Sequence, residues 1–224
     1  MNIKQTSPYR FARKIYRFLI KFKKKKEFDY INLWERNYNE GKDSGSGSYG
    51  ILAEFKSEII NNFVKQHELK NVIEFGCGDG NQLKYMNYKN YLGLDVSKSA
   101  IKLCSSIFRD DHAKSFFLYD PKFFYNNGFL KSELVICLDV LYHIIPEVDF
   151  KKTLQDIFSC SSKFIILYTD TESYKNFYYQ PDTHIYHRNI FDYLSIFTEF
   201  RIIELIEQRY KKLSSANFLI LEKL

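Results

Sequence analysis

Apolar positions along the chain follow two periods, which predict alternating strands and helices. From residue 71 onward, short apolar runs recur between polar stretches, as is typical of strands buried in a sheet. The expected strands are residues 71–75, 91–94, 115–119, 133–138, 163–168, 200–207 and 216–222. Helical spacing of apolar residues predicts helices in residues 81–87, 98–108, 149–160 and 187–197. This alternation predicts an α/β fold, a doubly wound sheet of seven mostly parallel strands covered on both faces.

The two ends of the chain depart from this alternation. Only residues 208–215 separate the last two expected strands. A crossover helix does not fit into this segment, so an antiparallel pair at one edge is expected. Helical spacing also predicts N-terminal helices in residues 9–22, 30–40 and 51–63. We expect residues 1–40 to form a basic amphipathic extension and residues 41–224 to form the main domain.

The positive charge of the chain belongs to its first residues. The whole sequence has 33 Lys or Arg against 27 Asp or Glu, a net charge of +6. Residues 1–26 contain ten Lys or Arg and no acid, so the remainder is acidic. A basic amphipathic helix in residues 9–26 suits an anionic membrane surface. A helix packed on the domain and a solvated tail are the alternatives. The acidic remainder makes nucleic acid an unfavoured partner.

Cysteine usage and hydropathy indicate the compartment. Four cysteines occur without a CxxC pair, so no metal site is expected, and buried free thiols in a reducing cytosol are the simplest interpretation. No run of about 18 apolar residues exists, so no transmembrane helix is expected. The N-terminus has no apolar segment followed by a small-residue cleavage site. A cytoplasmic protein is expected, with peripheral contact to the inner membrane face as a further hypothesis.

The stretch VIEFGCGDGNQL, residues 72–83, places three glycines directly after an expected strand. Such a turn aims backbone N–H groups at a ligand above the carboxyl edge of a doubly wound sheet. Asp95 ends the next strand, at the distance where an acid reaches a ribose diol. A dinucleotide fingerprint would need Gly or Ala where the sequence has Asn81. The alternative ligand carries an amino acid, whose ammonium group Glu74 could bind.

Together these motifs resemble the class I S-adenosylmethionine-dependent methyltransferases over roughly residues 50–222. The glycine turn matches the family's first motif, and Asp95 matches the acid that holds the ribose hydroxyls. Asp120 matches the acid that faces the adenine amine, and LDVLYHI, residues 138–144, matches the segment beside the methionine. The resemblance implies a Rossmann-like fold, with S-adenosylmethionine as cofactor and S-adenosylhomocysteine as product. The implied cofactor-binding residues are Glu74, Gly76, Cys77, Gly78, Gly80, Asp95, Val96, Asp120, Leu138 and Asp139.

Several of these positions have a structural alternative. Asp95 can cap the helix that begins near Ser97, and Asp120 precedes Pro121 and can form a turn. Asp79 is expected to contribute backbone more than side chain. Residues 44–50, SGSGSYG, are either a flexible linker or a lid over the cofactor. As a lid, this serine–glycine loop would bring Tyr49 to the methionine end.

Candidate catalytic residues lie after the fourth and fifth strands. An oxygen or nitrogen nucleophile can require a base, and loops at these strand ends converge above the cofactor. His143, His184 and His187 are the candidate bases, although each could be a structural histidine. Arg188 is the candidate ligand for an anionic substrate group. The two histidines at 184 and 187 would hold a metal only with an added acid, and no metal site is predicted.

The absence of two nucleic-acid methyltransferase motifs narrows the expected class of substrate. Residues 138–142 read LDVLY, which is neither the Asn/Asp-Pro-Pro-aromatic motif of nucleic-acid amino-methyltransferases nor a Pro-Cys nucleophile. We therefore expect O-methylation of a hydroxyl or phosphate-like oxygen on a small molecule or glycan. A looser resemblance to small bacterial methyltransferases favours a surface-glycan precursor, as in capsule polysaccharide biosynthesis. The alternatives are a non-catalytic S-adenosylmethionine-binding module and an NAD-dependent oxidoreductase. The methyl acceptor and the oligomeric state stay open.

Overall fold

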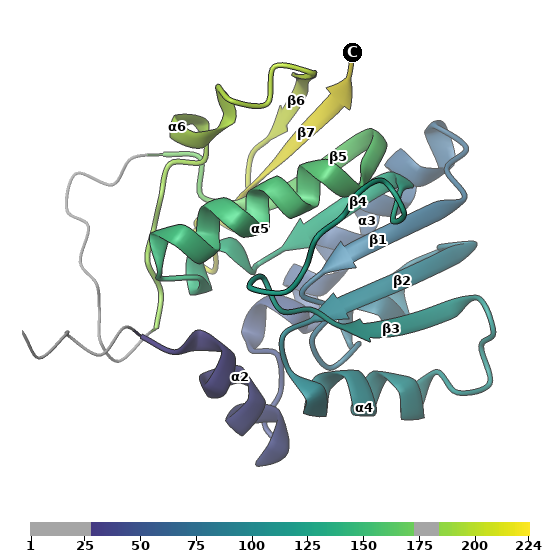
Figure 1. The fold of residues 1–224 in the computed structure, drawn as a ribbon. Coiled ribbons are helices and arrows are strands. Elements are labelled where there is room, and N and C mark those ends of the chain that lie inside the picture. The colour runs from purple at the N-terminus through teal and green to yellow at the C-terminus, as the bar shows by residue number, and fades with distance from the viewer. Residues whose placement is uncertain (1–27, 173–183) are drawn as a thin grey trace, which may run out of the picture.

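The computed structural model describes residues 28–172 and 184–224. The helix expected in residues 9–22 and the membrane contact expected in residues 9–26 lie outside the described residues. In the described part of the chain, seven strands form one sheet in the order β3-β2-β1-β4-β5-β7-β6 (Figure 1). The strands are β1 (Asn71–Phe75), β2 (Asn90–Asp95), β3 (Lys114–Leu118), β4 (Ser132–Leu138), β5 (Ser161–Thr169), β6 (Phe200–Ile206) and β7 (Asn217–Lys223).

The direction of the strands confirms the predicted fold class. The first five strands are parallel to one another. β7 lies between β5 and β6 and is antiparallel to both. The carboxyl ends of β1, β2 and β4 therefore meet at one edge of the sheet, where they point toward α2 (Figure 1). That edge is where parallel sheets place their ligands.

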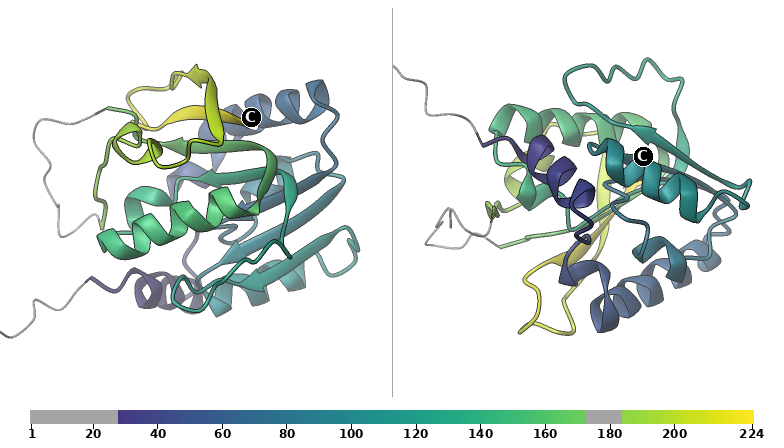
Figure 2. Two further views of the ribbon diagram at one scale, coloured as in Figure 1. Left: turned by 45° about the horizontal axis from the view of Figure 1, so that its top comes forward. Right: turned by 90° about the horizontal axis from the view of Figure 1, so that it is seen from below.

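Helices cover the two faces of the sheet, with α5 on one side and α3 on the other (Figure 2). Alternate residues of β4 feed the two apolar cores: Val135 packs with the core under α5, and Leu134 with the core under α3. This period of two is the reason the central strands read as continuous apolar runs. The helices are α2 (Tyr30–Asn39), α3 (Gly50–Gln66), α4 (Lys98–Ile107), α5 (Glu147–Cys160) and α6 (Phe191–Leu194).

Two expected helices are shorter than the sequence suggested. Residues 81–87 form only a 3-10 turn, Gln82–Tyr85, because the Asn81 and Gln82 side chains hydrogen-bond to the neighbouring loop and to α3. Residues 187–197 contain only the short α6. The chain ahead of it is held by the Ile190 N–H on the carbonyl of Asp170, so the helix begins late. Both predictions were wrong because long-range hydrogen bonds outweighed local periodicity.

None of the helices in the described residues is long and apolar enough to cross a membrane. All four cysteines are buried free thiols. The helix α2, which the expected extension included, packs against α4. The division of the chain at residue 40 stays a prediction, but part of the expected extension is in contact with the domain.

Candidate functional site

A pocket opens at the carboxyl edge of the sheet, with an empty volume of about 810 Å³ including open solvent. Its floor is the glycine turn after β1. Gly76 and Gly78 adopt φ values of +84° and +56°, which L side chains rarely tolerate. A Cβ on Gly76 would overlap the Val140 side chain, and one on Gly78 would overlap the Ser44 hydroxyl. Glycine is therefore required at both positions for the turn to pack against Val140 and Ser44, and both glycines line the pocket.

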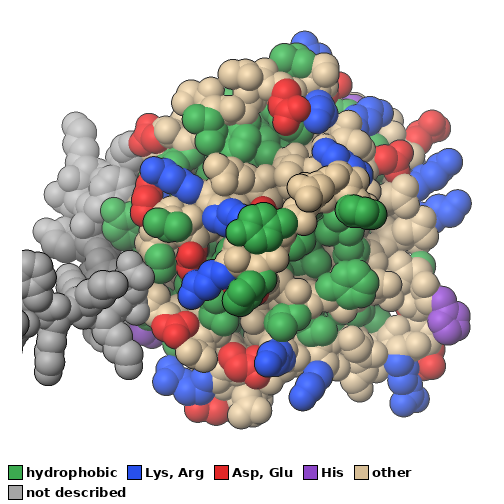
Figure 3. Space-filling model, in the orientation of Figure 1, with side chains coloured by type: hydrophobic (Ala, Val, Ile, Leu, Met, Phe, Trp, Pro, Cys, Tyr) green, Lys and Arg blue, Asp and Glu red, His purple; other side chains and the backbone are tan. Residues whose placement is uncertain are grey.

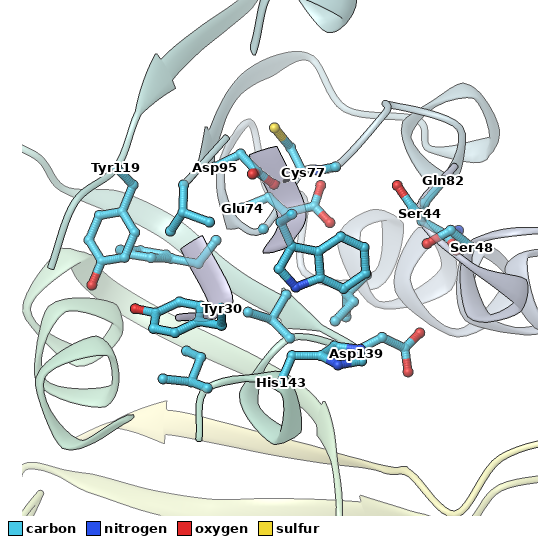
Figure 4. Close-up of a pocket in the computed structure, with 18 of the residues that line it drawn as sticks. Tyr30, Ser44, Ser48, Glu74, Cys77, Gln82, Asp95, Tyr119, Asp139 and His143 are labelled. Atoms are coloured by element: carbon cyan, nitrogen blue, oxygen red, sulfur yellow. Dashed lines mark hydrogen bonds between the residues drawn. The ribbon is translucent and has the colours of Figure 1, made fainter. Parts of the chain in front are cut away.

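Asp95 lies at the end of β2 and braces the turn. Its Oδ2 accepts the Gly78 N–H at 2.9 Å, and its Oδ1 accepts the Ser97 N–H at 2.9 Å. Burial raises the pKa of this carboxyl to about 6, although the backbone N–H donors favour the charged form. Ser97, and not Asp95, caps α4 by accepting the Ala100 N–H. Asp95 lines the pocket (Figure 4), which is the position expected of a residue that binds a ribose.

Glu74 is a buried carboxyl that faces the same pocket (Figure 4). Burial raises its pKa to about 7, while the hydrogen bond from Tyr91 and the charge of Lys56 oppose that rise. The Tyr91 hydroxyl donates to Glu74 Oε2 at 2.5 Å. A buried acid with one hydroxyl partner is costly to ionise. A cationic ligand group would supply the missing charge.

A charge pair between buried Lys56, which the sequence analysis missed, and partly buried Asp139 also lines the pocket. Lys56 of α3 is 1% exposed, and its Nζ is 2.5 Å from Asp139 Oδ2. The Tyr142 hydroxyl donates to Asp139 Oδ1 at 2.6 Å. Asp139 adopts φ of +60°, a conformation that costs a non-glycine residue about 1–2 kcal/mol. The signal was available, because Lys56 interrupts the apolar stripe of its helix.

The serine–glycine loop is folded over the site and is not an open linker. The Ser44 N–H donates to Asp79 Oδ2 at 2.9 Å, and the Asp79 N–H donates to Ser44 Oγ at 2.9 Å. The Tyr49 hydroxyl donates to the same Oδ2 at 2.6 Å. A Cβ on Gly47 would lie 2.8 Å from Asp139 Oδ2. These contacts place the loop against the glycine turn and Asp139, as the lid interpretation expects.

Two expectations about this loop need correction. Tyr49 is absent from the residues that line the pocket, because its hydroxyl is held by Asp79. The Asp79 side chain, expected to be passive, is the anchor of the loop. Ser44 and Ser48 line the pocket in place of Tyr49 (Figure 4).

The helix α2 forms a roof that the sequence did not assign to the site. Tyr30, Trp34 and Tyr38 of this helix all line the pocket. Glu35 fastens the helix by accepting the Ser97 hydroxyl at 2.7 Å and the Ser99 hydroxyl at 2.8 Å. The roof is therefore aromatic, which suits a planar heterocycle or a cation.

The adenine-side acid expected from the sequence does not reach the pocket. Asp120 Oδ1 accepts the Lys122 N–H at 2.9 Å, so this carboxylate shapes the turn before Pro121. Tyr119, its neighbour, lines the pocket instead (Figure 4). Gly80 is also remote from the lining, because it packs against Phe108. The other implied cofactor residues all line the pocket: Glu74, Gly76, Cys77, Gly78, Asp95, Val96, Leu138 and Asp139.

The histidines occupy three different environments. His143 lines the pocket, and burial lowers its pKa, which favours the neutral imidazole. His187 has its Nδ1 2.8 Å from Oδ2 of the buried Asp170, and this hydrogen bond raises its pKa. His187 is not among the residues that line the pocket, and its ring lies 6.4 Å from the ring of Tyr142, whose hydroxyl binds Asp139. His184 stacks on Phe28 outside the pocket lining.

Arg188 is a structural residue, contrary to the expectation. Its Nη1 donates to the Ile144 carbonyl at 2.9 Å and its Nη2 to the Ile145 carbonyl at 2.6 Å. The guanidinium lies 4.3 Å from the centroids of the Phe150 and Tyr186 rings. The buried guanidinium fixes the loop before α5, and Arg188 is not among the residues that line the pocket.

A family model described as a methyltransferase domain matches residues 49–207. No curated protein sequence matches the chain. Magnesium protoporphyrin IX methyltransferase from Synechocystis PCC 6803, solved with bound S-adenosylmethionine, has a TM-score of 0.62 and 16% identity over 89% of this chain and 100% of its own. The N-methyltransferase NodS from Bradyrhizobium japonicum WM9, solved with S-adenosylhomocysteine, has a TM-score of 0.66 and 12% identity over 88% of this chain and 99% of its own. A methyltransferase from Clostridium acetobutylicum ATCC 824 has a TM-score of 0.57 and 16% identity over 97% and 99%.

Proposed function

The chain belongs to the methyltransferase domain family, and from this membership we propose that it is an S-adenosylmethionine-dependent methyltransferase acting on an oxygen nucleophile. One observation carries the proposal: two buried acids, Glu74 and Asp95, flank a glycine turn whose backbone is open to the pocket. A nucleoside that carries an amino acid presents a diol and an ammonium group, which suit these two acids.

The residues present fit S-adenosylmethionine. Asp95 would hold the ribose diol, and Glu74 would compensate the ammonium group. Lys56, which is paired with Asp139, is the buried cation in the pocket lining that would face the carboxylate of the amino acid. Gln82 adds a further acceptor, because its Nε2 donates to Ala53 while its buried Oε1 has no hydrogen-bond partner in the described structure. The aromatic roof of α2 would exclude water from the nucleoside.

When bound, S-adenosylmethionine supplies an electrophilic methyl group on a sulfonium. The chain's own contribution is to orient the acceptor and take its proton. Asp170 Oδ2 lies 2.8 Å from His187 Nδ1 and orients this ring beside the site. We propose His187, which lies outside the pocket lining, as the group that takes the acceptor proton, and His143 as part of the pocket wall.

For the acceptor we propose a hydroxyl or phosphate-like oxygen of a small molecule or surface-glycan precursor, at a cytoplasmic site. The paired His187 and Asp170 suit a hydroxyl acceptor, which loses a proton on methylation, although an amine acceptor would lose one as well. Both structural neighbours with named reactions bind the same cofactor in their crystals but differ in acceptor, so they support the class of reaction alone.

Calorimetric titration with S-adenosylhomocysteine tests the cofactor. We expect micromolar affinity for the native protein and at least a tenfold loss for Asp95→Ala, with no response to NAD. Asp110→Ala removes an acid whose side chain is 91% exposed and serves as the matched control. No detectable binding of S-adenosylhomocysteine would refute the cofactor assignment.

A labelled-methyl assay with hydroxyl-, phosphate- and amine-bearing acceptors tests the transfer. Base-stable label on a hydroxylated acceptor is expected. Label on amines alone would refute oxygen transfer, and binding without any transfer would favour a non-catalytic module.

A further inference from the structure

The connection between β3 and β4 exposes aromatic side chains. Residues 119–131 contain no helix, so the connection from edge strand β3 to central strand β4 crosses the sheet without one. Phe123, Tyr125 and Phe129 are 79%, 78% and 99% exposed. At 150–250 Å² per aromatic side chain, they present roughly 500 Å² of apolar surface, near the upper end for a monomer. We name residues 119–131 the aromatic loop.

The aromatic loop is held firmly from within. Its inward residue Phe124 packs edge-on against Tyr119, with ring centroids 5.3 Å apart. Asn126 Nδ2 donates to the Leu130 carbonyl at 2.7 Å, and Asn126 Oδ1 accepts the Leu130 N–H at 3.0 Å. Lys152 of α5 donates to the Phe124 carbonyl at 2.8 Å. The exposed rings are therefore displayed by a fixed scaffold.

The shape of this region suits a lipid surface better than a protein partner with a complementary groove. In the view from below, the loop projects outward on the side of the molecule that carries α5 (Figure 2). The face that includes it shows hydrophobic side chains gathered near its middle, with Lys and Arg among them (Figure 3). Rings on a convex projection can enter a headgroup layer without a complementary groove, and aromatic side chains favour that layer.

Charge selects the kind of surface. Lys122 and Lys131 are exposed on the aromatic loop, whereas the nearby Lys152 ammonium is already paired with Asp156. The loop contains one acid, Asp120, which is committed to the Lys122 backbone. The first 26 residues of the chain add ten Lys or Arg and no acid. Basic groups beside exposed aromatics are attracted to anionic lipid headgroups.

We propose that the aromatic loop is a docking site for an anionic membrane surface, with Phe123, Tyr125 and Phe129 in the headgroup layer. The loop orients the molecule with its α5 side toward the bilayer. This inference is independent of the methyl-transfer chemistry.

Flotation with vesicles of 70% phosphatidylcholine and 30% phosphatidylglycerol tests the proposal in the full chain. The patch variant is Phe123→Ser, Tyr125→Ser and Phe129→Ser. The matched control is Ile196→Ser with Leu213→Ser, at side chains 64% and 61% exposed on other segments. The basic first residues are the same in all three proteins, so any difference reports on the loop. We expect at least a tenfold loss of partitioning for the patch variant and none for the control.

Binding of the patch variant equal to that of the native protein would overturn the proposal. So would a native dimer that the patch variant converts to monomers in light scattering, because the rings would then cover a second copy. A spectroscopic probe adds a positive readout: Phe129→Trp fluorescence should be quenched by brominated lipids, and Leu213→Trp fluorescence should not. Equal quenching of both would also refute insertion of the loop.

Discussion

Replacing Glu74 by glutamine is expected to stabilise the ligand-free protein while weakening its binding of S-adenosylhomocysteine. Burial raises the pKa of Glu74 from its ordinary value of 4.5 to about 7. Between these pH values the folded protein holds a proton that the unfolded chain has released. At about 1.4 kcal/mol per pH unit, ionised Glu74 costs the folded state about 3 kcal/mol above pH 7.

The sign of the pH dependence follows from the raised pKa. The stability linked to Glu74 is fully present below pH 4.5 and is lost as the pH rises through about 7. Glutamine keeps the shape of the neutral acid and can accept the Tyr91 hydroxyl, and the pKa of about 7 already includes the opposing effect of that hydrogen bond. The net gain at pH 8 is therefore about 3 kcal/mol, or about 6–12 °C in Tm for a chain of this length. At pH 5 the gain should nearly vanish.

Thermal unfolding from pH 5 to pH 8 measures this effect. Glu133→Gln is the matched control, because the Lys70 and Asn71 N–H groups lower the pKa of Glu133 and its replacement should lower Tm at pH 8. Calorimetry should show at least a tenfold weaker affinity of Glu74→Gln for S-adenosylhomocysteine. If Glu74→Gln does not raise Tm at pH 8, or raises it equally at pH 5 and pH 8, the reasoning about burial is refuted. Unchanged affinity would refute the role of Glu74 in the pocket.

Three further changes probe the rest of the site. Lys56→Met should lower the free energy of unfolding in urea by about 3–5 kcal/mol, because the Asp139 carboxylate loses its cation. Adding Asp139→Asn should recover part of this loss, and equal losses in the single and double variants would contradict a direct pair. Asp79→Ala should release the serine–glycine loop, with faster hydrogen exchange in that loop and weaker S-adenosylhomocysteine binding; unchanged exchange would show that other contacts hold it. Asp170→Asn should lower the pKa of His187, because it removes the carboxylate that raises this pKa. The rising limb of the pH–rate profile should then move to lower pH, and the maximal rate should fall. A rising limb that does not move would exclude His187 as the base.

The sequence by itself determined the sheet and the centre of the pocket floor. Strand periodicity and the short segment between the last two strands depend on neighbours along the chain, and they predicted all seven strands and the antiparallel pairing. The glycine turn and Asp95 are equally local, because backbone conformation and a strand end fix their places. The sequence shows the aromatic residues of the loop before β4, but it does not show that their side chains are exposed.

Only the tertiary structure decided which charges are paired and which side chains reach the pocket. Lys56 and Asp139 are 83 positions apart, so no local pattern joins them. Arg188, a candidate substrate ligand in the sequence, is consumed by carbonyls more than 40 positions away. His187 gained the buried partner Asp170, which the sequence had not revealed. Burial sets the strength of such contacts, and burial depends on how distant segments pack together.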